Sequence, residues 1–212
     1  MSGTDRNRAI HGVVVPDQPK NERLFQTASH QESSILDCRQ GLTSLRFKPR
    51  GALVFLIDYF KKHNISYRLY EHPAVFTVAE SKKVTQHIPG LRTKSLFLRD
   101  EHANFYLVCM PGEERLNIKA LRALLNVKEL HFGSPEELKQ ELRVTPGSVS
   151  LFAMIHAHST TLIIDQHVWD APLIGAHPNI NTSTLVITHA ALERFCASLA
   201  HPPKILKVTS NA

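Results

Sequence analysis

The sequence predicts an α/β fold of the α+β kind, built from short antiparallel strands and helices. Apolar residues recur at helical spacing after Gly51, and helices with capping signals begin near 118 and 135. Two strand-like runs, 94–99 and 105–110, are joined by a connection short enough for an antiparallel hairpin. Because two helices follow this hairpin in succession, the order differs from the regular alternation of a parallel sheet.

The domain is expected to begin at Gly51. Residues 1–50 show no sustained period of 2 or 3.6 and contain Pro16, Pro19 and Pro49 among polar groups. They hold 8 Lys and Arg against 5 Asp and Glu, so they contribute 8 − 5 = +3 to the total charge of +6. We predict a flexible or loosely packed N-terminal extension over 1–50 and one domain over 51–212. A solvated tail and an RNA-binding arm both agree with this charge.

The domain opens with a helix in which Leu53, Leu56 and Phe60 repeat at helical spacing. Asn64 suits a left-handed residue after its end. The next predicted elements are, in order, a strand over 67–70 ended by His72-Pro73, a helix from Thr77 to about Gln86, and a turn over 88–90.

The hairpin is expected inside a covered sheet, because Leu96, Phe97 and Leu98 are consecutive apolar residues. Asn117 caps the helix that follows it, and Ser134 begins a capping signal for another. The remaining predicted elements are strands over 150–155, 162–165 and 185–187, a helix from Thr188 to about Leu199, and a strand near 205–208.

Composition narrows the class of protein. The net charge of +6 favours an anionic partner, with nucleic acid the leading candidate. The apolar run 52–57 is far below membrane-spanning length. Cys38, Cys109 and Cys196 are odd in number and lack C-x-x-C spacing, so neither a disulfide framework nor a zinc knuckle is indicated. The N-terminal residues lack the apolar stretch of a secretory signal, and the expected location is the cytoplasm.

Several familiar chemistries lack their motifs. The sequence contains no phosphate-binding glycine loop, no G-x-S-x-G and no H-E-x-x-H. His156 and His158 have no third ligand at zinc spacing, so neither a metal nor a cofactor is expected. Cys109 lies in an apolar run and is predicted to be a small core residue rather than a nucleophile.

Lys94 is the first candidate functional residue. It opens the first strand of the hairpin and shares a face with Leu96 and Leu98 by the period of 2. Its ammonium is therefore expected at the mouth of the strand, where a cation suits a phosphate. The alternative is a strand-end lysine that extends into water.

Two loops add candidate binding groups. Gly147 allows a tight turn with Pro146 and Ser148, whose backbone N–H groups can face an ester carbonyl or its developing oxyanion. His177 and Asn181 offer donors and acceptors for a ribose, an amino group or water. A plain turn and a self-bonded loop explain the same residues.

Five motifs stand in a fixed order: YEHPAVFTVAE at 70–80, IPG at 88–90, TKSLFLRD at 93–100, VTPGSVS at 144–150, and HP with NT within 177–182. Together they resemble the freestanding editing domains related to the insertion domain of prolyl-tRNA synthetase, the YbaK-like superfamily. Within that superfamily the pattern is most similar to the ProXp-ala (PrdX) group. The resemblance covers about 51–208 and implies an editing-domain-like mixed, largely antiparallel sheet or partial barrel flanked by helices.

The resemblance implies trans-editing, the hydrolysis of the ester that links alanine to the 3′-terminal ribose of proline tRNA. In the family the Lys of the T-K-[NST]-L motif, here Lys94, engages the 3′-terminal nucleotide, and Ser95 follows it as a second catalytic candidate. Water is the nucleophile, helped by the free ribose hydroxyl. The residues that carry over to the aminoacyl pocket are Gly147, Ser148, Val149, His177 and Asn181. The implied partner is mischarged proline tRNA, not DNA or a membrane, with prolyl-tRNA synthetase or an elongation factor as candidate protein partners.

Two positions depart from the ProXp-ala pattern. Ser95 stands where relatives usually have Asn, and it offers a single hydroxyl donor. Leu151 stands where they usually have Pro, and it is expected to place an apolar side chain near the pocket and to alter the accepted amino acid. Two alternatives therefore stay open: a deacylase for cysteine, serine or threonine on tRNA, and a non-catalytic tRNA- or synthetase-binding module of the same fold.

Overall fold

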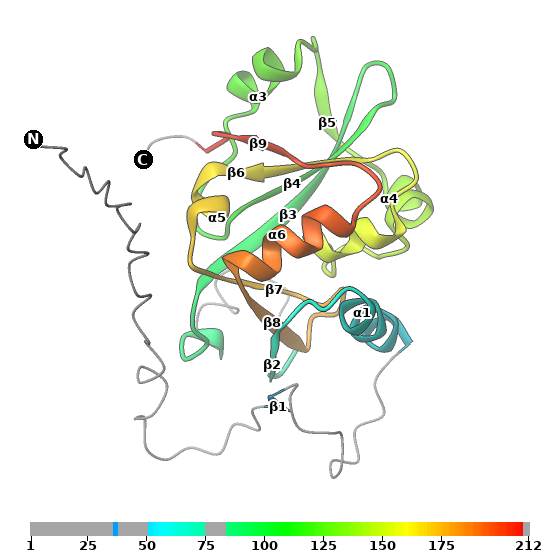
Figure 1. Ribbon diagram of the computed structural model, residues 1–212. Helices are drawn as coiled ribbons and strands as arrows, with labels where there is room; N and C mark the ends of the chain where they lie inside the picture. The colour runs from blue at the N-terminus through cyan, green and yellow to red at the C-terminus, as the bar shows by residue number, and fades with distance from the viewer. Residues whose placement is uncertain (1–35, 38–50, 75–83, 210–212) are drawn as a thin grey trace, which may run out of the picture. The chain divides into compact units, whose positions relative to one another are not determined.

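A computed structural model of the chain describes residues 36–37, 51–74 and 84–209. Within these ranges the strands form one open sheet in the order β1-β2-β8-β7-β3-β4-β6-β9, with β5 paired to β3 (Figure 1). Most neighbours are antiparallel, whereas β3–β7, β4–β6 and β6–β9 are parallel. The predicted mixed, largely antiparallel sheet is confirmed. The strands are β1 (Leu36–Asp37), β2 (Arg68–Glu71), β3 (Leu91–Asp100), β4 (Phe105–Pro111), β5 (Leu130–Phe132), β6 (Thr161–Asp165), β7 (Leu173–Ala176), β8 (Ser183–Thr188) and β9 (Lys204–Leu206).

The helices flank this sheet, and their ends use the predicted signals. Asn64 adopts a left-handed φ of 54° after the first helix. The Asn117 side chain accepts a hydrogen bond from the Ala120 N–H, and Ser134 forms a reciprocal capping box with Glu137. None of the helices in the described ranges is long and apolar enough to cross a membrane. The helices are α1 (Gly51–Lys62), α3 (Ile118–Leu125), α4 (Pro135–Leu142), the 3₁₀ helix η1 (Leu151–His156), α5 (Gln166–Asp170) and α6 (His189–Ser198).

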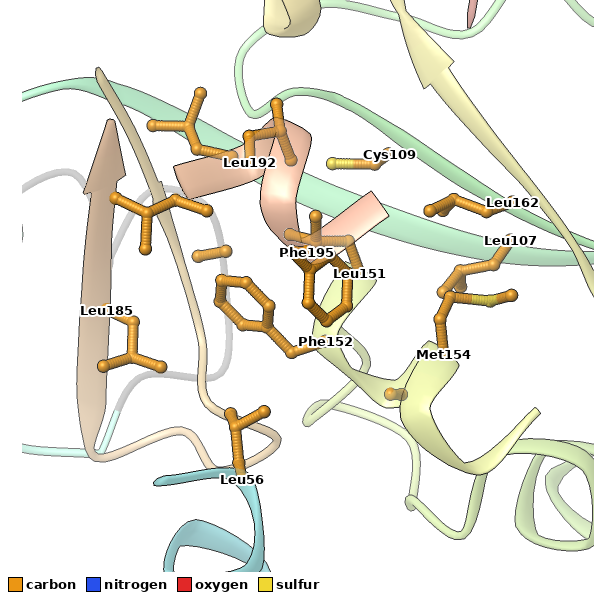
Figure 2. Close-up of a cluster of buried hydrophobic side chains, with 14 of the residues drawn as sticks. Leu56, Leu107, Cys109, Leu151, Phe152, Met154, Leu162, Leu185, Leu192 and Phe195 are labelled. Atoms are coloured by element: carbon orange, nitrogen blue, oxygen red, sulfur yellow. The ribbon is translucent and has the colours of Figure 1, made fainter. Parts of the chain in front are cut away.

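One face of the sheet packs against the main core, the buried cluster built with α1, α4, η1 and α6. Alternate residues of the hairpin, among them Phe97, Leu107 and Cys109, point into it. Figure 2 shows Phe152 of η1 and Phe195 of α6 side by side in this cluster, with ring centroids 5.3 Å apart in an edge-to-face arrangement.

The other face of the sheet carries two smaller apolar clusters. At one end, Leu121 of α3 packs on Leu98, Val108 and Met110, and we call this the α3 cluster. At the other end, Tyr70, Ile88 and Val186 form the Ile88 cluster. Both faces of β3 are therefore covered, as its three consecutive apolar residues predict. On this face of the sheet, polar side chains occupy the region between the α3 cluster and the Ile88 cluster.

A strand was predicted over 150–155. The structure has the 3₁₀ helix η1 there instead. The Ser150 side chain accepts a hydrogen bond from the Phe152 N–H and so caps the helix. Leu151 to Met154 are all buried, so the run is apolar on every side. Such a run fits a covered strand and a buried helix equally well, and periodicity cannot separate them.

Four short elements, β1, β5, α5 and β7, were not predicted. Each has five residues or fewer, too short for a hydrophobic period to show. The helix predicted from Thr77 to about Gln86 lies largely outside the described residues. Strand β1 falls within the segment 1–50 and pairs antiparallel with β2 through Leu36 and Leu69.

Candidate active site

Lys94 lies on β3, opposite Met110 of β4, on the sheet face that carries the α3 cluster. Its Nζ donates a hydrogen bond of 2.5 Å to the backbone carbonyl oxygen of Glu114, in the turn after β4. The Glu114 carboxylate in turn lies 3.1 Å from Nδ1 of His167. Burial lowers the pKa of Lys94, the carboxylate of Glu114 opposes this effect, and the positive charge of Arg115 adds to it. β3 begins at Leu91, so Lys94 lies within the strand rather than opening it as predicted, and the loop after β4 holds its ammonium.

His177 follows β7, the strand that pairs in parallel with the start of β3. Strands β3 and β7 are parallel and pair Leu91 with Ile174 and Arg92 with Gly175, and Lys94 and His177 each come two residues after the last pair. Nδ1 of His177 lies 3.2 Å from the carbonyl oxygen of Ser183. A carbonyl only accepts, so Nδ1 carries the proton and Nε2 of the neutral ring is an acceptor.

The charge state of His177 is set by its surroundings. Burial lowers its pKa, and the neighbouring His72 lowers it further, whereas the hydrogen bond to Ser183 acts in the opposite direction. The net direction is downward from the ordinary value of 6.5. The neutral ring, with Nε2 available as an acceptor, is thus the form that this site favours.

A second imidazole completes this polar face. Nδ1 of His72 donates to the carbonyl oxygen of Pro73 at 2.8 Å, and its Nε2 lies 3.0 Å from the Thr184 hydroxyl. The His72 and His177 rings are 6.1 Å apart and nearly edge to face. His72 and Thr184 were not predicted as site residues, although His72 stands in the first of the five motifs.

The loop between β7 and β8 places Asn179, rather than Asn181, in the interior. Asn179 adopts a left-handed φ of 60°, and 6% of its surface is exposed. Within the described ranges, Oδ1 of Asn179 and Oγ of Ser183 are buried without a hydrogen-bond partner. Each such atom costs about 1–3 kcal/mol in lost hydration, so the loop retains unused hydrogen-bonding capacity. Asn181 is partly buried, and its side chain makes no hydrogen bond to a described residue.

The structure does not bring the side chains of Lys94 and Ser95 together. Ser95 is paired with Cys109, and its hydroxyl interacts with the Cys109 thiol on the main-core face. Successive residues of a strand point to opposite faces, so Ser95 turns away from the Lys94 ammonium. The period of 2 was sufficient to show this separation from the sequence.

The loop before η1 has the backbone that its glycine predicts. Gly147 has a φ of 84°, and a Cβ placed on it would meet no atom within 4 Å. The Ser148 N–H donates to the Thr145 carbonyl at 3.1 Å, and Val149 packs against the main core. Among the described residues, no hydrogen bond or ion pair joins this loop to Lys94 or His177.

Leu151 was predicted to place an apolar side chain near the aminoacyl pocket, and this prediction is wrong. Its side chain is fully buried in the main core, where it begins η1, and it adds no apolar surface to the face that carries Lys94. A buried position explains a leucine here, because its side chain gains hydrophobic contacts in the main core. Proline would instead fix the backbone φ at the start of η1.

The buried cysteines do not offer a nucleophile. Burial raises the pKa of both Cys109 and Cys196 to about 12, which disfavours the thiolate that attacks a carbonyl. The prediction that Cys109 is a small core residue is confirmed, since it is fully buried in the main core. Within the part of the chain that is described, no three His, Cys, Asp or Glu side chains group to hold a metal ion.

Solved structures share this fold. A candidate trans-editing enzyme for prolyl-tRNA synthetase superposes with a TM-score of 0.63 at 16% identity, covering 77% of this chain and 100% of its own. A hypothetical protein superposes with a TM-score of 0.61 at 18% identity, covering 73% of this chain and 99% of its own. Such identities show the fold alone.

The sequence identifies the family. The model of the aminoacyl-tRNA editing domain matches residues 72–195, more than half of the chain. Prolyl-tRNA synthetase associated domain-containing protein 1 of Danio rerio is 34% identical over 155 residues, 71% of this chain and 84% of that protein. Prolyl-tRNA editing protein ProX of Acetoanaerobium sticklandii is 29% identical over 148 residues, 68% of this chain and 88% of that protein. The chain therefore belongs to the aminoacyl-tRNA editing domain family, which confirms the resemblance of its five motifs.

Proposed function

We propose that this protein is a trans-editing deacylase that hydrolyses the ester of alanine on proline tRNA. The observation that carries the proposal is the Lys94 ammonium, which the Glu114 carbonyl holds on a sheet face between two apolar clusters. His177 follows β7, the strand that pairs with the start of β3. Membership of the editing family supports the reaction type. The names of the relatives support proline tRNA, and the likeness to the ProXp-ala group supports alanine.

In this proposal Lys94 positions the 3′-terminal nucleotide. Its ammonium donates to the Glu114 carbonyl and keeps two further N–H donors for a phosphate or ribose oxygen. A protonated amine has no lone pair for attack, so Lys94 acts as a cation and not as a covalent nucleophile. A compact, strongly hydrated ammonium suits this single-point contact.

His177 is proposed to orient the reacting groups. The acceptor Nε2 of the neutral ring can receive a hydrogen bond from the α-ammonium of the aminoacyl group or from the attacking water. The unpartnered oxygens of Asn179, in the loop before β8, and of Ser183, at the start of β8, add acceptor capacity. Ser148 and Val149 remain pocket candidates from the resemblance, together with Gly147 and Asn181.

The proposed reaction is a direct hydrolysis. Water adds to the ester carbonyl, the bond between that carbon and the ribose 3′ oxygen breaks, and a proton passes to this oxygen. The products are free alanine and tRNA with a 3′ hydroxyl. The likeness to the family assigns help in activating the water to the neighbouring ribose hydroxyl. We place the activity in the cytoplasm, because its substrate is made during translation.

The test uses the full chain with proline tRNA charged separately with alanine, cysteine, serine and proline. We expect rapid loss of the alanyl ester and little loss of the prolyl ester. Lys94→Ala should lower the rate at least about 100-fold, as the loss of a positioning contact does. Lys61→Ala on α1 is the matched control, because Lys61 is a surface lysine on the main-core side.

Each outcome of this assay decides between the candidates. Faster hydrolysis of the cysteinyl or seryl ester than of the alanyl ester would overturn alanine as the substrate and identify a deacylase for another misacylated tRNA. No hydrolysis above that of Lys94→Ala with any ester would leave a tRNA- or synthetase-binding module and overturn the deacylase.

A further inference from the structure

We propose that three basic side chains along α3, namely Arg115, Lys119 and Arg122, bind phosphates of the acceptor arm of tRNA beside the active site. We call these residues the α3 stripe. The inference rests on the proposed function, since it assigns a surface to the same substrate.

The charge of this segment is unusual within the chain. Residues 115–128 contain four basic side chains, those of the stripe and Lys128, and no Asp or Glu. They therefore contribute +4, whereas the whole chain has a net charge of +6. All four side chains are exposed, and none forms an ion pair with a described residue. Three other cations of the described residues form ion pairs: Lys61 with Asp58, Arg92 with Glu113 and Arg99 with Glu137.

The geometry of α3 turns this charge outward. Leu121 is fully buried in the α3 cluster and fixes the helix on the sheet face that also carries Lys94. Lys119 and Arg122 are three residues apart, so they lie on one side of the helix. Arg115 comes just before the helix and extends the stripe toward the site.

The stripe begins next to the residue that holds Lys94. Glu114 accepts the hydrogen bond from the Lys94 ammonium, and Arg115 is its neighbour in the chain. Arg115 is also close enough for its charge to lower the pKa of Lys94. A strand whose terminal nucleotide is at Lys94 would therefore meet the stripe with the phosphates that precede it. Repeated phosphates are the partner that a row of unpaired cations fits.

A membrane surface fits this helix less well. An amphipathic membrane helix inserts its apolar side, but the fully buried Leu121 of α3 already packs in the protein. The helix has 8 residues, and the exposed Ile118 and Leu124 are single side chains rather than a continuous apolar face.

The test measures binding of uncharged proline tRNA, so it does not need hydrolysis. The stripe variant Arg115→Gln, Lys119→Gln and Arg122→Gln is compared with Lys61→Gln, Lys62→Gln and Lys139→Gln. The control removes the same charge from α1 and α4, which cover the main-core side of the sheet. Glutamine keeps helix propensity, and thermal melting of both variants checks that they fold.

We expect the stripe variant to bind roughly tenfold more weakly at physiological salt, and the slope of log affinity against log salt to become shallower by about 2 to 3. The affinity of the control variant should stay within about threefold of that of the wild type, because its three substitutions lower only the overall net charge and remove no proposed phosphate contact. Equal losses in affinity and slope for the two variants would overturn the stripe. Loss of binding to vesicles of phosphatidylcholine and phosphatidylserine, with tRNA binding unchanged, would reassign it to a membrane.

Failure of the stripe and failure of the proposed function give different results. If wild-type protein hydrolyses no charged tRNA but the slope difference holds, the deacylase is wrong and the RNA surface stands. If alanyl-tRNA is hydrolysed and the stripe variant behaves as the control does, the surface is wrong and the deacylase stands.

Discussion

The ammonium of Lys94 donates a hydrogen bond to the backbone carbonyl oxygen of Glu114, 20 residues further along the chain. The turn after β4 therefore sets the position of the cation on which the proposed chemistry depends. The residue after Glu114 begins the α3 stripe, so one loop couples the active site to the proposed RNA surface. The contact between the Lys94 ammonium and the Glu114 carbonyl therefore depends on the size and shape of the side chain at position 94 as well as on its charge.

Lys94→Arg is expected to keep the charge but lose most of the activity. A guanidinium is larger and planar, so it cannot keep the single-point contact with the Glu114 carbonyl and reach the same phosphate. We expect kcat/KM for alanyl-tRNA to fall at least about tenfold, with an unchanged melting temperature. Activity equal to that of the wild type would show that charge alone is needed at this position.

Ser95→Ala is expected to leave most of the activity. The Ser95 hydroxyl faces Cys109 and the main core, on the opposite side of β3 from Lys94. We expect kcat/KM to change by less than about threefold, in the same assay that measures Lys94→Arg. A loss as large as that of Lys94→Ala would mean that Ser95 acts on the substrate by a route its orientation does not provide.

His177 should titrate below its ordinary pKa of 6.5, because burial and His72 favour the neutral ring. The unfolded chain then binds the proton first, so this contribution to stability is complete above pH 6.5 and declines as the pH falls toward the lowered pKa. The same protonation removes the acceptor Nε2, so kcat/KM should fall on the acid side.

The ring resonances of His177 in an NMR titration give its midpoint directly. His177→Gln keeps a polar side chain without a titrating ring, and it should remove this part of the pH dependence of stability. His156, whose pKa is also lowered by burial and by Arg143, remains as the background signal. A midpoint for His177 at or above 6.5 would contradict the prediction.

Asp100→Ala is expected to destabilise the β3–β4 hairpin. The buried Asp100 carboxylate accepts hydrogen bonds from the backbone N–H groups of His102 and Asn104, the Asn104 amide and the Tyr106 hydroxyl. Removing it leaves these donors unpaired and should lower the free energy of unfolding at pH 7 by about 3 kcal/mol. Asp58→Ala, which removes an exposed ion pair with Lys61, should cost less than about 1 kcal/mol.

The same carboxylate gives a signed pH dependence. Burial alone would raise the pKa of Asp100, but the hydrogen bonds from Asn104, Tyr106 and His102 outweigh it and lower the pKa below 3.8. Its contribution is therefore complete above pH 3.8 and declines as the pH falls through the lowered pKa. Urea denaturation should show the gap between wild type and Asp100→Ala narrowing at strongly acid pH. A gap that widens there would reverse the sign.

Gly133→Ala is expected to strain the core. A Cβ at this position would collide with ring atoms of Phe97, which is buried and stacked on Phe105 with centroids 5.3 Å apart. We expect a loss of about 1–3 kcal/mol in the free energy of unfolding. Gly147→Ala is the contrast, since its Cβ meets no atom and its positive φ alone costs about 1 kcal/mol. Denaturation with urea compares the two, and equal losses would contradict a collision at Phe97.

The sequence by itself determined the local structure and the family. Asn117 and Ser134 fix helix starts through their own side chains, and the alternation of the hairpin fixes which residues share a face, so Lys94 and Ser95 were separable from their spacing. These features depend on residues a few positions apart. The five motifs likewise lie in single short segments.

Only the tertiary structure decided the site. The Thr184 hydroxyl lies 3.0 Å from Nε2 of His72 across 112 positions of the chain, and the parallel pairing of β3 with β7 brings the start of the Lys94 strand to the strand that precedes His177. Leu151 to Met154 are buried on all sides, which fits a strand and a helix equally well, so only the structure shows that this run is the 3₁₀ helix η1. Strand order and packing set such contacts, because they depend on which distant segments become neighbours.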